Sequence, residues 1–159
     1  MSYRPAFTRR TALTLLAGTA VLPLASAWAA ENQVITVHKD PNCGCCTGWV
    51  QHLQKAGFTV KTIETADLDA VKARLGVPTD LAACHTAQVD GYLIEGHVPA
   101  VALKRFLNEK PNATGLAVPG MPVGSPGMEG AKPEHDAGVL FSPHSRSTYM
   151  RFLGDQVFG

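Results

Sequence analysis

Residues 34–64 read VITVHKDPNCGCCTGWVQHLQKAGFTVKTIE, and the order of elements within them decides the fold. The first six residues are β-branched and apolar, which predicts a buried strand, and residues 40–42 (DPN) end it. Over residues 45–56, apolar side chains recur every three or four positions, as in an amphipathic helix, and Gly57 ends that helix. Residues 58–64 alternate as a second strand. A strand, a helix and another strand in this order predict a βαβ unit.

The residues that follow predict a hairpin and a further helix. We expect a second helix over residues 67–75 and a short helical turn over 79–84. The segments TAQV and YLIEG flank Asp90-Gly91, a strong β-hairpin signal, and another helix is expected over residues 99–108. The sequence therefore predicts an α/β fold: a thioredoxin-like βαβ unit followed by a β-hairpin and helix.

The C-terminal part has a different character. Residues 115–138 are rich in glycine and proline, and they contain Met121 and Met128. The segment is long for a plain connector, so we treat it as a Gly/Pro/Met-rich loop with a role of its own. Residues 139–153 then predict a C-terminal hairpin or ribbon.

Residues 1–29 have the pattern of a cleaved bacterial secretory signal. Basic residues precede an apolar run over 12–24, which is short for a membrane span, and small residues follow it. We expect a periplasmic location, no stable membrane span after cleavage, and a single domain over residues 30–159. The pair Arg9-Arg10 resembles a twin-arginine signal, so both general and twin-arginine export fit. An uncleaved anchor is the alternative.

The charge of the chain excludes one class of function. Cleavage after Ala29 would leave 130 residues, with 11 basic and 13 acidic side chains and a formal charge of −2. No basic patch or arm remains in that part of the sequence, so we expect no nucleic-acid partner.

Four cysteines carry the chemistry. Cys43, Cys45 and Cys46 lie where the first helix begins, and its N-terminus favours thiolates. Cys84 precedes the third strand, where the thioredoxin-like arrangement brings it to the other three. Three interpretations compete: a soft-metal site, a thiol–disulfide oxidoreductase or copper reductase that uses Cys43 and Cys46, and a disulfide-stapled exported domain. The surplus Cys45 argues for the metal site, and the clustering argues against stapling.

The ligand types point to a soft metal ion. Thiolates select Cu(I), zinc or iron–sulfur clusters, and adjacent cysteines favour sulfurs that bridge several Cu(I) ions. Met121 and Met128 offer thioethers, which bind Cu(I) well, or else a hydrophobic lid. His97 and His85 are further candidates, as ligands, as hydrogen-bond donors to ligands or as ordinary buried histidines.

Three motifs together resemble a bacterial family of exported, CopG-like copper-resistance proteins. They are PNCGCCTGW (41–49), LAACHTAQVDGYLIEGHVPA (81–100) and GLAVPGMPVGSPGME (115–129). The resemblance implies a thioredoxin-like fold and copper handling in the periplasm. It also implies that Cys43, Cys45, Cys46 and Cys84 hold Cu(I). We therefore predict a periplasmic Cu(I)-binding protein of copper resistance or trafficking, whose partners are copper ions and other periplasmic copper-handling proteins.

Overall fold

The computed structural model describes residues 33–158, and the predicted signal segment 1–29 lies outside them. The described chain alternates helices and strands, which confirms the predicted α/β class. The elements are β1 (Val34–Lys39), α1 (Gly44–Lys55), β2 (Thr59–Glu64), α2 (Leu68–Leu75), a 3-10 turn (Thr79–Leu81), β3 (His85–Val89), β4 (Tyr92–Glu95), α3 (Ala100–Glu109), β5 (Gly115–Ala117), β6 (His135–Ser142), β7 (Ser145–Leu153) and β8 (Gln156–Val157).

The strands form one mixed sheet in the order β2-β1-β3-β4-β5-β6-β7-β8. β1 and β2 are parallel and are joined by α1, so the predicted βαβ unit is present. β3 runs antiparallel to both β1 and β4, which gives the predicted hairpin beside that unit. The term thioredoxin-like stays an interpretation of this order.

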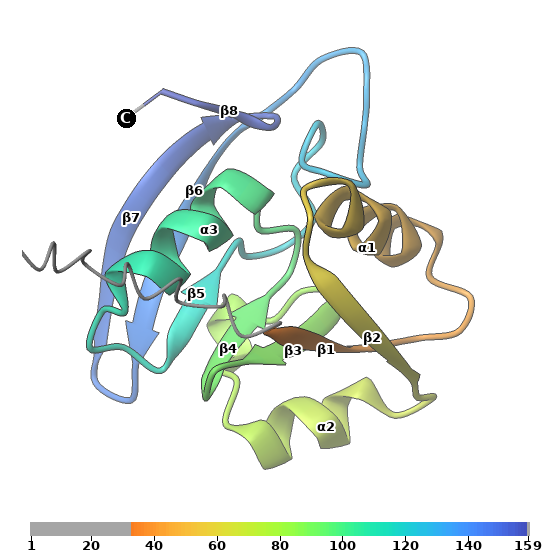
Figure 1. Cartoon of the computed structure of the whole chain (residues 1–159), viewed down its shortest axis with the longest axis vertical. Coiled ribbons are helices and arrows are strands. Elements are labelled where there is room, and N and C mark those ends of the chain that lie inside the picture. Colours follow the sequence, from red (N-terminus) through yellow and green to blue (C-terminus); the bar gives the residue numbers. More distant parts are fainter. Residues whose placement is uncertain (1–32, 159) are drawn as a thin grey trace, which may run out of the picture.

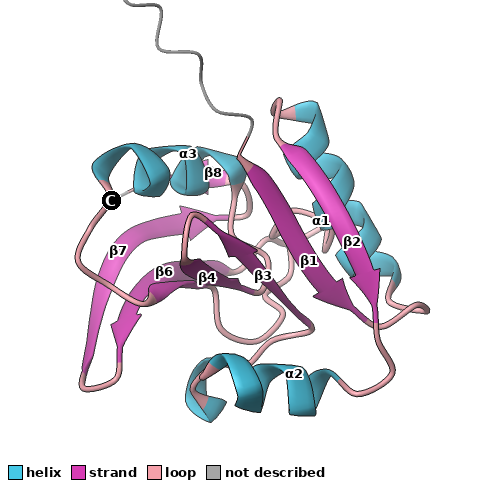
Figure 2. Cartoon of the chain, turned by 60° about the horizontal axis from the view of Figure 1, so that its bottom comes forward, coloured by secondary structure: helices cyan, strands magenta, loops and turns pink. Residues whose placement is uncertain are grey.

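Helices lie on both faces of the sheet. α1 and α3 lie on one side of β1 and β3, and α2 lies on the other (Figures 1 and 2). Between the sheet and the first pair of helices is the main core, to which α3 contributes Leu103, Phe106 and Leu107 at the spacing of one helix face. A smaller cluster, which includes Leu81 and Phe141, packs separately.

Local sequence signals explain two of the turns. Asp90 and Gly91 have φ angles of 51° and 80°, so both central residues of the β3–β4 turn have the positive φ that such a hairpin needs. Asp67 caps α2 by accepting a hydrogen bond from the Ala70 N–H at 2.9 Å, and Gly76 ends that helix with φ 79°. The hairpin predicted at Asp90-Gly91 and the helix predicted over residues 67–75 are confirmed.

The C-terminal part differs from the prediction. The Gly/Pro-rich segment begins with a strand, β5, which pairs parallel with β4. Gly115 has no space for a side chain, because a Cβ there would overlap the Leu93 carbonyl. The predicted ribbon is present as β6 and β7, but β6 begins at His135, earlier than expected, and β8 is additional. None of the described helices has the length and apolar character needed to cross a membrane.

Candidate metal centre

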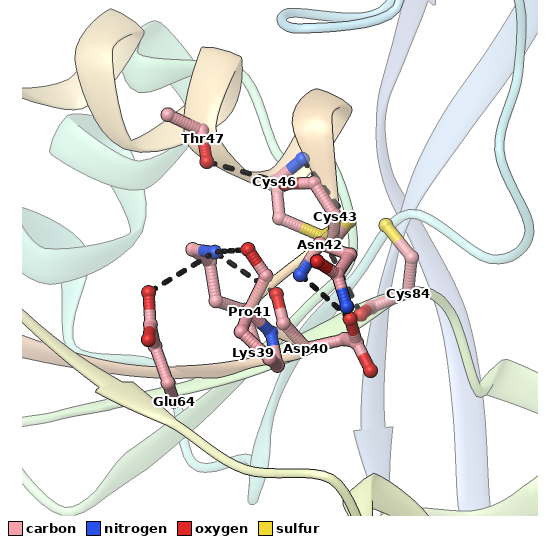
Figure 3. Close-up of polar contacts among 9 residues, drawn as sticks. All are labelled: Lys39, Asp40, Pro41, Asn42, Cys43, Cys46, Thr47, Glu64 and Cys84. Carbon is pink, nitrogen blue, oxygen red and sulfur yellow. Dashed lines mark hydrogen bonds and ion pairs between the residues drawn. A yellow bond between two sulfur atoms is a disulfide. The ribbon is translucent and has the colours of Figure 1, made fainter.

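A fixed turn between β1 and α1 presents the first three cysteines. The Asp40 carboxylate accepts a hydrogen bond from the Asn42 N–H at 2.7 Å, and the Cys43 N–H donates to the Asp40 carbonyl at 3.1 Å. Buried Lys39 donates to the same carbonyl at 2.9 Å and lies 3.8 Å from the Glu64 carboxylate (Figure 3). These contacts hold the turn to the ends of β1 and β2, so the start of α1 has a defined position.

Cys43 and Cys46 form a disulfide at the N-terminus of α1. Cys43 is also the N-cap residue, and its sulfur accepts a hydrogen bond from the Cys46 N–H at 3.3 Å. Cys45 and Cys84 are free. The disulfide closes only one helical turn, so it does not join distant parts of the chain. The interpretation as a disulfide-stapled domain is therefore wrong.

The fold brings Cys84 to the other three cysteines, as predicted. Cys45 Sγ lies 3.4 Å from Cys43 Sγ and 3.9 Å from Cys84 Sγ. All four sulfur atoms lie within 4.8 Å of one another, and Figure 3 shows Cys84 across from the Cys43–Cys46 pair. Cys46 Sγ lies 3.5 Å from the Cys84 carbonyl oxygen. Their role as metal ligands stays a prediction.

Two buried histidines adjoin Cys84. His97 Nε2 lies 2.9 Å from Cys84 Sγ, and His97 Nδ1 lies 2.8 Å from the Pro126 carbonyl oxygen. That carbonyl can only accept, so Nδ1 carries the proton and Nε2 presents its lone pair to the sulfur. His85 Nδ1 lies 3.4 Å from Cys84 Sγ, and the His85 ring stacks on Trp49 with centroids 4.3 Å apart. Both predicted histidines thus reach the cysteine cluster.

Burial keeps Cys84 and the two histidines uncharged without a metal ion. Burial, and then the proximity of Cys45, raise the pKa of the Cys84 thiol to about 12. Burial lowers the pKa of His97, and lowers that of His85 well below its ordinary value. A soft cation that binds here meets neutral imidazoles and must displace a thiol proton.

A buried ion pair between Lys72 and Glu95 lies next to Cys84, and the sequence analysis did not predict it. Glu95 Oε1 accepts hydrogen bonds from Lys72 Nζ at 2.5 Å and from the Ala83 N–H at 2.7 Å. Its other oxygen accepts from the Thr86 hydroxyl at 2.6 Å, and Lys72 Nζ lies 2.8 Å from that hydroxyl. The pair therefore holds the chain on both sides of Cys84.

A signal for this pair is present in the sequence. Lys72 occupies a position on the apolar stripe of α2 that Leu68, Val71 and Leu75 define, where a charged residue is unusual. Glu95 ends the otherwise apolar strand β4 and is fully buried. Two opposite charges at positions expected to be apolar point to a buried pair.

The Gly/Pro-rich loop covers the start of α1. Gly127 packs against this helix so closely that a Cβ would lie 2.7 Å from Trp49 N and even nearer the Cys45 carbonyl. Its neighbour Met128 is partly buried, whereas Met121 is 55% exposed. The loop therefore reaches the cysteine cluster through Pro126 and Gly127, and a ligand role for either methionine sulfur stays a prediction.

Comparisons with known proteins agree with these residues. A family model described as a protein of unknown function, DUF411, matches residues 81–128, which include Cys84, His85 and His97. A solved structure named copper resistance protein CopG, form 1, is 46% identical, with a TM-score of 0.71. The match covers 76% of this chain and 98% of that one. Form 2 is 45% identical, with the same coverage and TM-score. Among curated proteins none matches.

Proposed function

Because the chain belongs to the CopG-like copper-resistance family, we propose that it binds Cu(I) through Cys43, Cys45, Cys46 and Cys84 in copper resistance or trafficking. The observation that carries the proposal is the convergence of four cysteine sulfurs within 4.8 Å of one another. Cysteines that only pack in a core have no reason to gather at one helix N-terminus.

The chemistry of the donors favours Cu(I). Thiolates are soft ligands, imidazole also suits copper, and carboxylates, which harder ions prefer, are absent from the two clusters of possible ligands in the described residues. Cys45 Sγ lies 3.4 Å from Cys43 Sγ and 3.9 Å from Cys84 Sγ, so it can bridge ions that the other two sulfurs hold. Zinc also accepts four thiolates, so zinc is the competing ion to test.

Binding by all four sulfurs requires a reduced chain. The disulfide between Cys43 and Cys46 withholds two ligands until two electrons and two protons convert it to thiols. Each thiol then loses its proton when copper binds, since the thiolate is the ligand.

The same disulfide supports a second candidate function. A Cys43–Cys46 pair at a helix N-terminus is the arrangement of a thiol–disulfide oxidoreductase. As a copper reductase, the two thiolates would form the disulfide and pass two electrons to two Cu(II) ions, which become Cu(I). Neither reaction uses Cys45.

The deciding experiment compares Cys45→Ser with the parent. Both proteins are reduced, kept anaerobic and titrated with Cu(I) against a competing chelator, with zinc in parallel. We expect the parent to hold more than one Cu(I) per chain, and Cys45→Ser to hold less copper while it remains folded. The rate of insulin reduction measures the thiol–disulfide oxidoreductase activity of the second candidate function. Copper binding unaltered in Cys45→Ser, together with vigorous insulin reduction, would promote the enzyme over the copper-binding protein.

The proposed place of action is the periplasm. It rests on the signal pattern of residues 1–29, and an exported copper-binding chain would exchange copper with other periplasmic copper-handling proteins. Expression of the full chain, followed by cell fractionation and mass determination of the product, tests export and cleavage. Recovery of the intact chain from the cytoplasm would contradict this assignment.

A further inference from the structure

We propose that His52 is a positioning residue for His97: neutral His52 holds the two segments that orient the His97 ring, and protonation of His52 releases them. The inference rests on the proposed Cu(I) binding and goes beyond it, because it makes the affinity for copper depend on a side chain outside the cysteine cluster. His52 lies half-buried on α1, away from the N-terminus that carries the cysteines.

His52 closes the N-terminus of α3. Its Nε2 atom accepts a hydrogen bond from the Ala100 N–H at 3.0 Å. Ala100 is buried and the side chain of the α3 N-cap residue makes no hydrogen bond, so this N–H needs an acceptor from elsewhere. The segment that leads from His97 into α3 is also held by Trp49, whose indole N–H donates to the Val98 carbonyl at 2.8 Å. Trp49 does not titrate, so any pH dependence of this attachment comes from His52.

The second segment is the Gly/Pro-rich loop. The Pro126 carbonyl accepts the hydrogen bond from His97 Nδ1–H at 2.8 Å, and the next N–H, that of Gly127, donates to the Glu129 carboxylate at 2.9 Å. His52, Pro126 and Glu129 line one cavity of about 380 Å³. The His52 imidazole therefore borders the loop that orients His97 as well as the start of α3.

The charges around His52 decide what its protonation does. Neutral His52 accepts through Nε2, whereas the protonated ring carries an N–H on both nitrogens and cannot accept from Ala100. The charged groups that face it are Glu129 of the loop, Asp155 of the turn between β7 and β8, and Lys55 of α1. The two carboxylates attract the imidazolium into the cavity. The start of α3 then loses its acceptor, and the loop carboxylate gains a partner other than its own backbone.

The protonation takes place below pH 6.5. Burial lowers the pKa of His52 from its ordinary value of 6.5, although Asp155 and Glu129 act to raise it. The folded chain thus binds this proton more weakly than the unfolded chain, so His52 stabilises the fold above pH 6.5, and this contribution is lost as the pH falls through the lowered pKa. The Gly127 N–H lowers the pKa of Glu129 below 4.5, so Glu129 remains a carboxylate while His52 becomes protonated.

Stability against pH tests the inference without copper. The reduced, copper-free chain is unfolded in urea at pH 8 and at pH 5, beside His52→Gln, whose amide oxygen can accept from Ala100 at both pH values. His144→Gln, at an exposed histidine between β6 and β7, is the matched control. We expect the unfolding equilibrium of the parent and of the control to shift about three- to tenfold more than that of His52→Gln. Equal shifts in all three proteins would overturn the inference.

Cu(I) competition on the reduced proteins at the same two pH values tests the link to His97. Acid weakens thiolate binding in every variant, because protons compete with the metal ion, so the effect of His52 is the difference between the parent and His52→Gln. We expect the affinity of the parent to fall about tenfold more than that of His52→Gln. Equal losses would overturn the role of His52 toward His97, even where stability differs. A reduced parent that binds no Cu(I) at pH 8 would instead overturn the proposed function.

Discussion

The contact between the Gly/Pro-rich loop and α1 is open to a matched test with two alanine substitutions. Gly127 and Gly120 lie in the same loop and have φ angles of 89° and 72°. A Cβ at Gly120 would meet nothing within 4 Å, whereas one at Gly127 would lie 2.7 Å from Trp49 N and even closer to the Cys45 carbonyl. The two substitutions therefore share the backbone cost and differ only in the clash.

The expected magnitudes follow from these two effects. Gly120→Ala should lower the free energy of unfolding by about 1–2 kcal/mol, the cost of a left-handed conformation with a Cβ. Gly127→Ala carries the same backbone cost. In addition, its Cβ would lie at least 0.7 Å closer to the Trp49 nitrogen and the Cys45 carbonyl oxygen than the 3.4 Å at which ordinary contact begins. We add about 1–3 kcal/mol for that overlap. The loop must move away from α1, and Pro126 with it, so the hydrogen bond that fixes His97 weakens.

Three measurements on the reduced proteins check this reasoning. Urea unfolding gives the stability difference between the two variants, and Cu(I) competition gives their affinities. The rate of thiol alkylation reports how accessible the cysteine cluster is in each variant. We expect Gly127→Ala to be the less stable variant, to bind Cu(I) more weakly and to react faster. Equal stability, copper affinity and alkylation in both variants would show that the loop does not hold the site.

Three further predictions concern charges and methionines. Glu95→Leu leaves the buried Lys72 unpaired and should lower the free energy of unfolding, measured in urea, by about 3–5 kcal/mol. The double variant Lys72→Met/Glu95→Leu should lose less stability. Equal losses in the two variants would contradict a tightly coupled pair. Burial raises the pKa of Asp136 from 3.8 to about 6, so the folded chain binds the proton more tightly and loses stability as the pH rises through that window. Asp136→Asn should therefore add about 1 kcal/mol at pH 8, after allowance for solvent screening, and nothing at pH 3.5; a gain equal at both pH values would refute the assignment. Met128→Leu should weaken Cu(I) binding and the exposed Met121→Leu should not, which competition titration measures; the reverse order would place the wrong sulfur at the site.

The elements around the site were predictable because short-range patterns encode them. The β-branched residues of β1, the apolar spacing of α1 and the Asp90-Gly91 turn each act within a few residues. Their order is enough to place β3 beside β1, and hence Cys84 near the start of α1. The meeting of the four cysteines therefore followed from topology and not from any single motif.

Elements without a local pattern were not predicted. β5 has only three residues, the first of them a glycine, and it is a strand because β4 and β6 lie on either side of it. The two residues of β8 likewise depend on pairing with β7. In both cases the partner strands supply the hydrogen bonds that the segment could not form alone.

By itself, the sequence determined the α/β class, the βαβ unit with its hairpin and helix, and the four cysteines as candidate ligands. Only the tertiary structure decided that Cys43 pairs with Cys46, that Pro126 orients His97, and that Lys72 meets Glu95 below Cys84. The physical reason is the range of the interactions. Helix and turn preferences act between near neighbours, whereas the contacts of His97 and Lys72 depend on the packing of segments that lie far apart in the chain. The disulfide is short-range, but the sequence offers three crowded sulfurs, and only their positions in the structure show which two are bonded.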